Sequence, residues 1–102
     1  MSRRLQLSDI FHNVLGVKNV YFQPPTSTQI KYPCIVYKRT GYNALKADNK
    51  LYRAIDRYQV TYITKDPDSE VPLQILGTFE MCSHNSRFTS DNLYHDVFDL
   101  YY

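Results

Sequence analysis

The strongest candidate for a chemical site lies near the C-terminal end of the sequence, where Cys82, His84 and His95 are followed by Asp99. A cysteine next to a histidine could act as a nucleophile, and a cysteine with two histidines could bind zinc. Strand alternation would place Cys82 and His84 on the same face. The spacing matches no compact pattern of zinc ligands, however, and it supplies no fourth ligand. The sequence therefore favours a buried cysteine with surface or hairpin-paired histidines, and we expect no catalytic residue, metal or other cofactor.

Three acidic residues, Asp66, Asp68 and Glu70, alternate as they do in calcium-binding loops. An EF-hand also needs a glycine at its sharp turn and a glutamate at its last position, and both are missing here. Acidic residues at the start of a helix interact favourably with the helix dipole. A helix N-terminus therefore explains these three residues without a bound ion.

Basic and aromatic side chains alternate around the middle of the chain, a pattern found in nucleic-acid-binding surfaces. They are Lys38, Arg39, Lys46, Lys50 and Arg53, with Tyr37, Tyr42 and Tyr52 between them. Asp48 and Asp56 interrupt the positive charge, and the formal net charge is only +2. The same charges could meet an acidic neighbouring subunit, so a nucleic-acid-binding module stays an alternative.

The most distinctive segment is the polar stretch of residues 41–52, between two segments with strand-like alternation, residues 32–40 and 53–64. It is roughly twice as long as an ordinary hairpin connection, and long connections in small domains are often functional. Its amide, ammonium, carboxylate and phenol groups suit protein–protein contact better than catalysis. We therefore predict a subunit or partner interface at Lys46, Ala47, Asp48, Asn49, Lys50, Tyr52 and Arg53.

Two short helices are expected from capping residues and apolar spacing. The first should begin at Ser8 or Asp9 and stop at Gly16. The second should follow Asp66 as its cap, with Pro67 in its first turn. Because a second proline, at residue 72, must also lie near the start of this helix, the helix should be short.

The remaining segments read as strands that pair into a sheet. Strands are expected over residues 17–23, 32–40 and 53–64, and near residues 81–87 and 93–101. This order predicts an α+β fold, with a small, mainly antiparallel sheet, two short helices packed on one face and a long hairpin loop. At 102 residues the chain should form a single domain, residues 1–102.

The clearest strand signal also predicts the core. Tyr58, Val60 and Tyr62 share one face, while Gln59 and Thr61 share the other. The first face should pack against the apolar side of the first helix. That side is expected to consist of Ile10, Phe11, Val14 and Leu15.

The amino-acid composition narrows the classes of protein to which the chain could belong. Ten tyrosines and no tryptophan fit a half-buried sheet and an interaction surface, because tyrosine joins an apolar ring to a polar tip. No apolar run approaches the length of a transmembrane helix, and no signal peptide is recognisable, so we expect synthesis and folding in a cytoplasm. Cys34 and Cys82 match no zinc spacing and are expected to be free, buried thiols.

Three short motifs carry a family resemblance. They are Tyr-Pro-Cys-Ile-Val-Tyr over residues 32–37, Ala-Asp-Asn-Lys-x-Tyr over residues 47–52, and Tyr-Gln-Val-Thr-Tyr-Ile-Thr-Lys-Asp-Pro-Asp-Ser-Glu over residues 58–70. With these motifs the chain resembles the tail terminator, or tail completion, proteins of long-tailed bacteriophages, which are also filed as minor capsid proteins. The likeness extends from about residue 20 to residue 102.

The resemblance implies a structural protein that forms a ring, usually of six copies, in the virion. The ring would cap the tail tube and join it to the head–tail connector. Its partners would be other copies of the chain, the tail tube protein and the connector or head-closure protein. No membrane is implied, and DNA would at most pass through the ring. The chain would be made in the host cytoplasm and would end at the tail–neck junction of the virion.

Alternatives remain at this point. Within the same class, the chain could be another neck component, a head-closure or head–tail adaptor protein. From other classes, a small metal or thiol enzyme would rest on Cys82, His84 and His95, and a nucleic-acid-binding module would rest on the basic residues and tyrosines.

Overall fold

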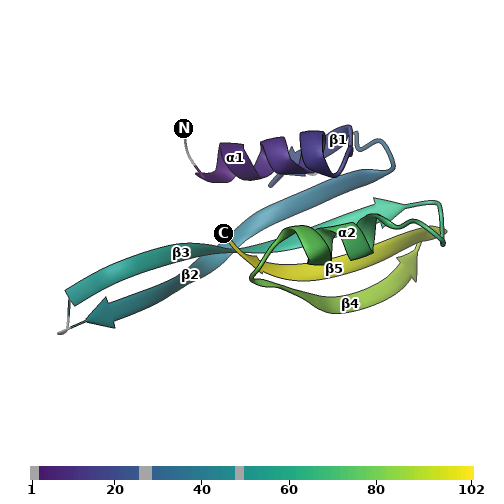
Figure 1. Cartoon of the computed structure of the whole chain (residues 1–102). Coiled ribbons are helices and arrows are strands. Elements are labelled where there is room, and N and C mark those ends of the chain that lie inside the picture. Colours follow the sequence, from purple (N-terminus) through teal and green to yellow (C-terminus); the bar gives the residue numbers. More distant parts are fainter. Residues whose placement is uncertain (1–2, 26–28, 48–49) are drawn as a thin grey trace.

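Five strands form one sheet in the order β1-β2-β3-β5-β4, as Figure 1 shows. The computed structural model describes residues 3–25, 29–47 and 50–102. The strands are β1 (Asn19–Phe22), β2 (Cys34–Ala47), β3 (Lys50–Thr64), β4 (Cys82–Ser90) and β5 (Leu93–Tyr101). Antiparallel pairing joins β2 to β3, β3 to β5 and β5 to β4, whereas β1 runs parallel to β2. The α+β fold with a mainly antiparallel sheet is therefore confirmed.

The first helix begins earlier than predicted. It comprises α1 (Arg3–Asp9) and a π-helical turn, η1 (Ile10–Val14). Asp9 has helical backbone angles and makes no side-chain capping bond, so the expected start at residue 8 or 9 is wrong. The apolar stripe continues towards the N-terminus, because Leu7 is fully buried four residues before Phe11. The predicted end is confirmed at Gly16, whose φ of 70° is readily adopted by glycine.

The second helix, α2 (Val71–Thr78), begins later than predicted. Its N-cap residue is Glu70, and Pro72 lies in its first turn. The expected cap at Asp66 is wrong because local side-chain bonds hold this segment as a turn. The Asp66 carboxylate accepts a hydrogen bond from the Asp68 N–H at 2.9 Å, and the Thr64 hydroxyl accepts one from the Asp66 N–H at 3.1 Å. Such local bonds compete with helix formation.

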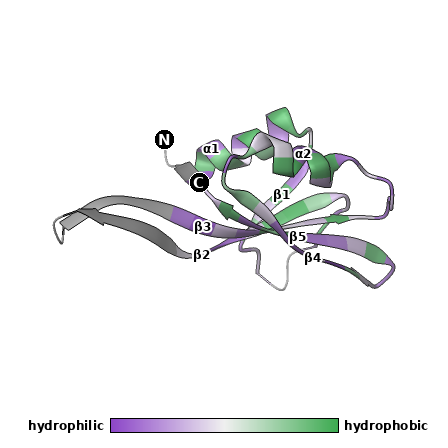
Figure 2. Ribbon diagram, turned by 60° about the horizontal axis from the view of Figure 1, so that its bottom comes forward, coloured by the Kyte–Doolittle hydropathy of each residue, from purple (hydrophilic) through white to green (hydrophobic). Residues whose placement is uncertain are grey.

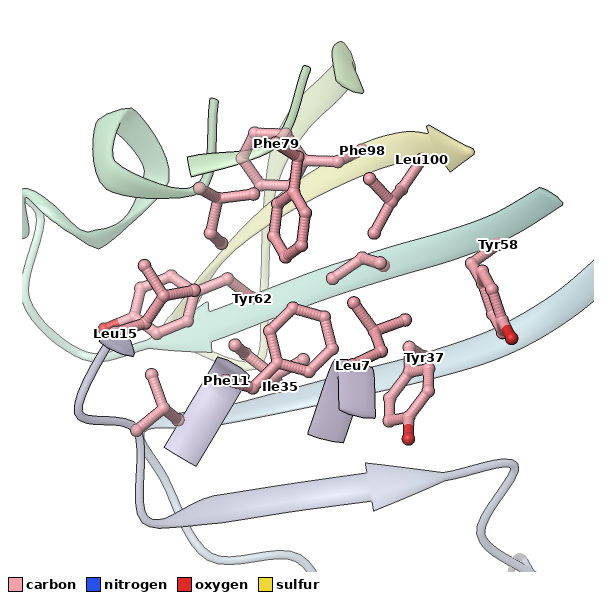
Figure 3. Packing of buried hydrophobic residues seen from close by; sticks show 13 residues of the cluster. Leu7, Phe11, Leu15, Ile35, Tyr37, Tyr58, Tyr62, Phe79, Phe98 and Leu100 are labelled. Carbon is pink, nitrogen blue, oxygen red and sulfur yellow. The ribbon is translucent and has the colours of Figure 1, made fainter. Parts of the chain in front are cut away.

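Both helices lie on the same face of the sheet, and the core fills the space between these layers (Figure 2). Tyr58, Val60 and Tyr62 are all buried, so the predicted inner face of β3 is confirmed. Phe11 contacts both sides of the core: its ring lies 5.3 Å from the ring of Tyr37 and 5.9 Å from that of Phe79, in edge-on geometry (Figure 3). Val14, in contrast, is 65% exposed and does not belong to the predicted helix stripe.

The C-terminal hairpin is tighter than predicted. β4 extends to Ser90 and pairs with Leu93 of β5, which leaves a two-residue turn. The turn residues Asp91 and Asn92 have φ values of 53° and 62°. Two positive φ values are characteristic of a type I′ turn, which matches the twist of the paired strands.

Candidate interaction site

The long β2–β3 hairpin extends beyond the rest of the sheet as a two-stranded arm, visible in Figure 1. Its pairs run from Gly41↔Arg57 to Ala47↔Lys50. β1 pairs only with the first residues of β2, and β5 pairs with β3 only from Arg57 onwards. We call residues 41–47 and 50–56 the arm. No other strand flanks it in the described part of the chain.

The structure confirms a long hairpin and corrects its form. Residues 41–47 and 50–52, which were expected in a loop, are paired strand. Their polar side chains gave little strand signal, but ladder hydrogen bonds are made by the backbone and do not depend on apolar side chains. The segment is therefore a two-stranded ladder and not a loop.

The predicted interface residues fall at the far end of this arm. Ala47 pairs with Lys50, Lys46 with Leu51, and Leu45 with Arg53. The ladder of the arm thus brings Lys46 and Ala47 next to Lys50. Tyr52 and Arg53 lie on β3, the same strand as Lys50. Asp48 and Asn49, also predicted at this interface, lie outside the described residues.

A polar cluster fixes one side of the arm at its base. The Arg39 guanidinium Nε lies 3.2 Å from the Asp56 carboxylate, and its NH2 group donates to the Tyr58 hydroxyl at 3.4 Å. The Tyr58 hydroxyl donates to the same carboxylate at 3.3 Å. The guanidinium carbon also lies 5.7 Å from the centre of the Tyr58 ring, within cation–π distance. These three residues therefore join β2 and β3 just before the arm begins.

The next cross-strand pair tightens the base. The Arg57 side chain donates from Nε to the Thr40 hydroxyl at 3.1 Å and from NH2 to the Thr40 carbonyl at 3.4 Å. The Thr40 hydroxyl donates to the Arg57 carbonyl at 3.2 Å. The pairing register shifts between Arg39 and Gly41, so a β-bulge lies at this point. Bulges bend strands and increase their twist, and this one sets the direction of the arm relative to the sheet.

Glycine suits position 41 because the arm base is crowded. A Cβ atom on Gly41 would lie 3.2 Å from the Arg57 NH2 atom. The chain end reinforces the opposite strand, since the Tyr102 N–H donates to the Asp56 carbonyl at 3.0 Å. We call Arg39, Thr40, Asp56, Arg57 and Tyr58 the base cluster. Together these contacts link β2 to β3 where the arm leaves the packed core.

The arm dominates the dimensions of the molecule. The principal extents are 51 × 27 × 24 Å, and the radius of gyration is 14.6 Å. A compact domain of this length would have a radius of gyration of about 13 Å. The molecule is therefore elongated along one axis, as expected for a small domain that carries a protruding hairpin.

The residues proposed from sequence as a chemical site do not converge. His84 Nε2 lies 3.1 Å from the carboxylate of Asp96, which the Arg87 side chain also contacts at 2.7 Å. His95 stacks on Phe88 instead, with ring centres 4.6 Å apart. Among the described residues, no group of three or more histidine, cysteine or acidic side chains could hold a metal ion.

Asp96 is a buried carboxylate with two side-chain partners that could not be identified from the sequence. It is a carboxylate with 4% exposure, and the cross-strand pair Arg87↔Asp96 places it beside its cation. Asp99, which follows the two histidines in the sequence, instead accepts a hydrogen bond from Asn85 at 2.9 Å. Only the bulge between His84 and Ser86 brings both His84 and Arg87 to Asp96, and a bulge has no clear sequence signal here.

Both thiols are free, and burial makes them poor nucleophiles. Desolvation raises the pKa of Cys34 to about 11. Desolvation, with a smaller contribution from the Asp99 charge, raises the pKa of Cys82 to about 11. Cys34 is fully buried, as predicted, whereas Cys82 is partly exposed at the margin of the core.

The other charged residues singled out in the sequence lie apart from one another. The Asp66 side chain is used in the turn before α2, and Arg39 in the base cluster. Lys38 is exposed and pairs across the ladder with Gln59. No helix of the described chain is long and apolar enough to span a bilayer.

Comparison with known proteins identifies no relative: no family model, curated protein or solved structure matches the chain. The arm and its base are therefore interpreted from their own geometry and from the sequence motifs described above.

Proposed function

We propose that this chain is a structural protein of a long-tailed bacteriophage, a tail terminator that forms a ring, caps the tail tube and joins it to the head–tail connector. The three motifs over residues 32–37, 47–52 and 58–70 suggest this family. The observation that carries the proposal is the arm, a rigidly based hairpin that projects from a small packed domain.

The geometry supports a role in assembly in two ways. First, no other described strand pairs with the edges of the arm, and such edges favour pairing with another chain. Second, the base cluster ties β2 to β3 where the arm begins, and contacts that order a segment before binding reduce the entropy that binding costs. A stable subunit contact needs about 1,200–2,000 Å² of total buried surface, which a protruding hairpin can help to supply.

The partners follow from this role. The chain binds other copies of itself, in a ring of six, and its two ring faces contact the tail tube protein and the connector or head-closure protein. An arm and the surface that receives it are different surfaces, and contacts between different surfaces close into rings when the rotation between copies allows it. DNA at most passes through the ring.

A second role within the same class uses the same features. A head-closure or head–tail adaptor protein would also need a projecting arm and a ring contact. The two roles differ in the neighbour that is bound: a terminator binds the end of isolated tail tubes, whereas an adaptor binds the connector. The raised thiol pKa values of Cys34 and Cys82 argue against the thiol-enzyme alternative.

The proposal is tested by shortening the arm. Replacing residues 44–54 with an Asn-Gly turn removes most of the arm and leaves the base cluster and core in place. Native mass spectrometry and electron microscopy should show rings of the unmodified chain, alone or on the ends of tail tubes. The shortened variant should remain a monomer with an unchanged melting temperature.

A surface variant away from the arm provides the control. Leu73 on α2 is 73% exposed, so Leu73→Gln should assemble like the unmodified chain. Rings formed by the shortened variant would contradict the proposal. A monomer that binds stoichiometric zinc and loses it on His84→Ala would instead favour the metal-enzyme alternative.

A further inference from the structure

β4 is a long strand at the edge of the sheet. It has nine residues, pairs on one side with β5, and is the last strand in the sheet order. In Figure 1, no element of the described chain lies beyond it. Natural edge strands are commonly blunted by proline, lysine or short length, and β4 (Cys82–Ser90) contains neither proline nor lysine. The other edge strand, β1, has only four residues.

The turn geometry shows which backbone groups of β4 face away from the sheet. Residues that flank a two-residue hairpin turn form a hydrogen-bonded pair, here Ser90 with Leu93. Hydrogen-bonded and non-hydrogen-bonded pairs alternate along an antiparallel ladder. Phe88 is therefore bonded to β5, whereas the N–H groups of Arg87 and Thr89 point outward.

A second observation gives the same alternation at the far end of β4. The Tyr101 N–H donates to the Met81 carbonyl at 2.9 Å, so this pair faces inward. The next position, Cys82 opposite Leu100, then faces outward. Outward-facing donors and acceptors therefore lie on both sides of the bulge between His84 and Ser86, and no strand in the described part of the chain pairs with this edge.

The β2 edge of the arm runs in the direction needed to pair with β4 as an antiparallel strand. β2, β3, β5 and β4 are each antiparallel to the next strand, so β4 runs antiparallel to β2. The free edge of β2 is on the β1 side of the sheet, and the free edge of β4 is on the opposite side. Two copies placed side by side in the same orientation therefore bring β4 of one copy against β2 of the next as an antiparallel pair.

The lengths also agree. Residues 41–47 of β2 form seven consecutive positions of the arm, about 23 Å at roughly 3.3 Å per residue. β4 provides nine residues for pairing with them. The other edge of the arm, on β3, lies on the same side of the sheet as β4. Pairing of this edge with β4 of a second copy would require that copy to be rotated by half a turn.

We propose that the outer edge of β4 receives the β2 edge of the arm, residues 41–47, from a second copy of this chain, and so extends the sheet between subunits. This inference rests on the proposed ring-forming function and names the contact that joins adjacent subunits. Because the two edges differ, the contact is head-to-tail: one copy keeps a free arm edge and the other keeps a free β4 edge for the next neighbours.

Amide hydrogen exchange tests the contact on the unmodified chain. At a dilute concentration, where native mass spectrometry shows monomers, the Arg87 and Thr89 amides should exchange rapidly. At millimolar concentration, where assemblies form, their exchange should slow at least roughly tenfold, as expected for newly formed backbone hydrogen bonds. The Phe88 amide is the internal control, because its bond to β5 protects it at both concentrations.

A matched pair of variants tests the same edge. Thr89→Pro removes the outward N–H and leaves the bonds to β5, which proline allows on the free side of an edge strand. Thr89→Ala removes the same side chain and keeps the N–H. Both should show the circular dichroism of the unmodified chain, and Thr89→Pro should raise the assembly concentration roughly tenfold relative to Thr89→Ala.

Two results would overturn the inference. Assemblies in which the Arg87 and Thr89 amides stay unprotected would show that subunits meet elsewhere, and the ring-forming function would stand. A chain that stays monomeric at millimolar concentration and on tail tubes would overturn the contact and the proposed function together. If Thr89→Pro unfolds, the exchange measurement on the unmodified chain decides.

Discussion

Tyr58 belongs to two parts of the molecule at once. Its ring is fully buried, 6.0 Å from the ring of Tyr37, while its hydroxyl meets Arg39 and Asp56 at the base of the arm. Burial is the largest cause that raises the pKa of Tyr58 above 10.0, so the hydroxyl stays a hydrogen-bond donor at neutral pH. Through this residue, the packing of the core and the angle of the arm are coupled.

At the same scale, truncating single core side chains to alanine should lower the free energy of unfolding in the order of the volume removed. Val60 and Phe11 are fully buried, whereas Gln59 lies on the other face of β3. Phe11→Ala should lower the free energy of unfolding by about 3–5 kcal/mol, Val60→Ala by about 2 kcal/mol and Gln59→Ala by less than about 0.5 kcal/mol. Urea denaturation measures all three, and a greater loss for Gln59→Ala than for Val60→Ala would contradict this assignment of the strand faces.

At the scale of elements, sequence patterns predicted types better than boundaries. β3 was found because its residues 58–62 alternate between apolar and polar, whereas residues 41–47 and 50–52 of the arm were missed because no regular alternation runs through them. α1 was placed too late because Ser8 resembles an N-cap, yet its hydroxyl contacts the Tyr37 hydroxyl instead. The residues predicted at an interface lie on the arm, but the base cluster could not be foreseen, since its contacts depend on the bulge at residues 39–41.

The base cluster should control the arm more than it controls the fold. Asp56→Ala removes the acceptor of the Tyr58 hydroxyl and the partner of Arg39, and should lower the free energy of unfolding by about 1–2 kcal/mol. Assembly measured by native mass spectrometry should fall further than this loss accounts for. Asp56→Asn keeps an acceptor for Tyr58 and should be milder in both measurements, so equal effects of the two variants would argue against this account.

At the scale of the whole molecule, the buried thiols make stability depend on alkaline pH. The pKa of Cys34 and of Cys82 rises from 9.0 to about 11 on folding, mainly through desolvation. Above pH 9, the unfolded chain releases the thiol protons while the folded chain retains them. Because the folded state then binds more protons, stability present below pH 9 is lost as the pH rises towards 11.

Denaturant unfolding at a series of pH values checks this expectation. The free energy of unfolding should fall between pH 9 and about pH 11. Cys34→Ala should reduce the slope, because it removes one of the two groups, although its stability at pH 8 will be lower. A slope that is unchanged in this variant would show that Cys34 does not contribute.

Four of the five strands form two hairpins that are local in the sequence, β2–β3 and β4–β5, joined where β3 meets β5, and β1 adds to β2 in parallel. Isolated hairpins form in about 1–10 μs, whereas pairs between residues far apart in the chain require slower loop closure. The slow step in folding is then the meeting of β3 with β5, from Thr64↔Tyr94 to Arg57↔Tyr101. Residues 50–56 of the arm take no part in that ladder, so the arm can change in length and sequence during evolution without slowing the folding of the domain that carries it.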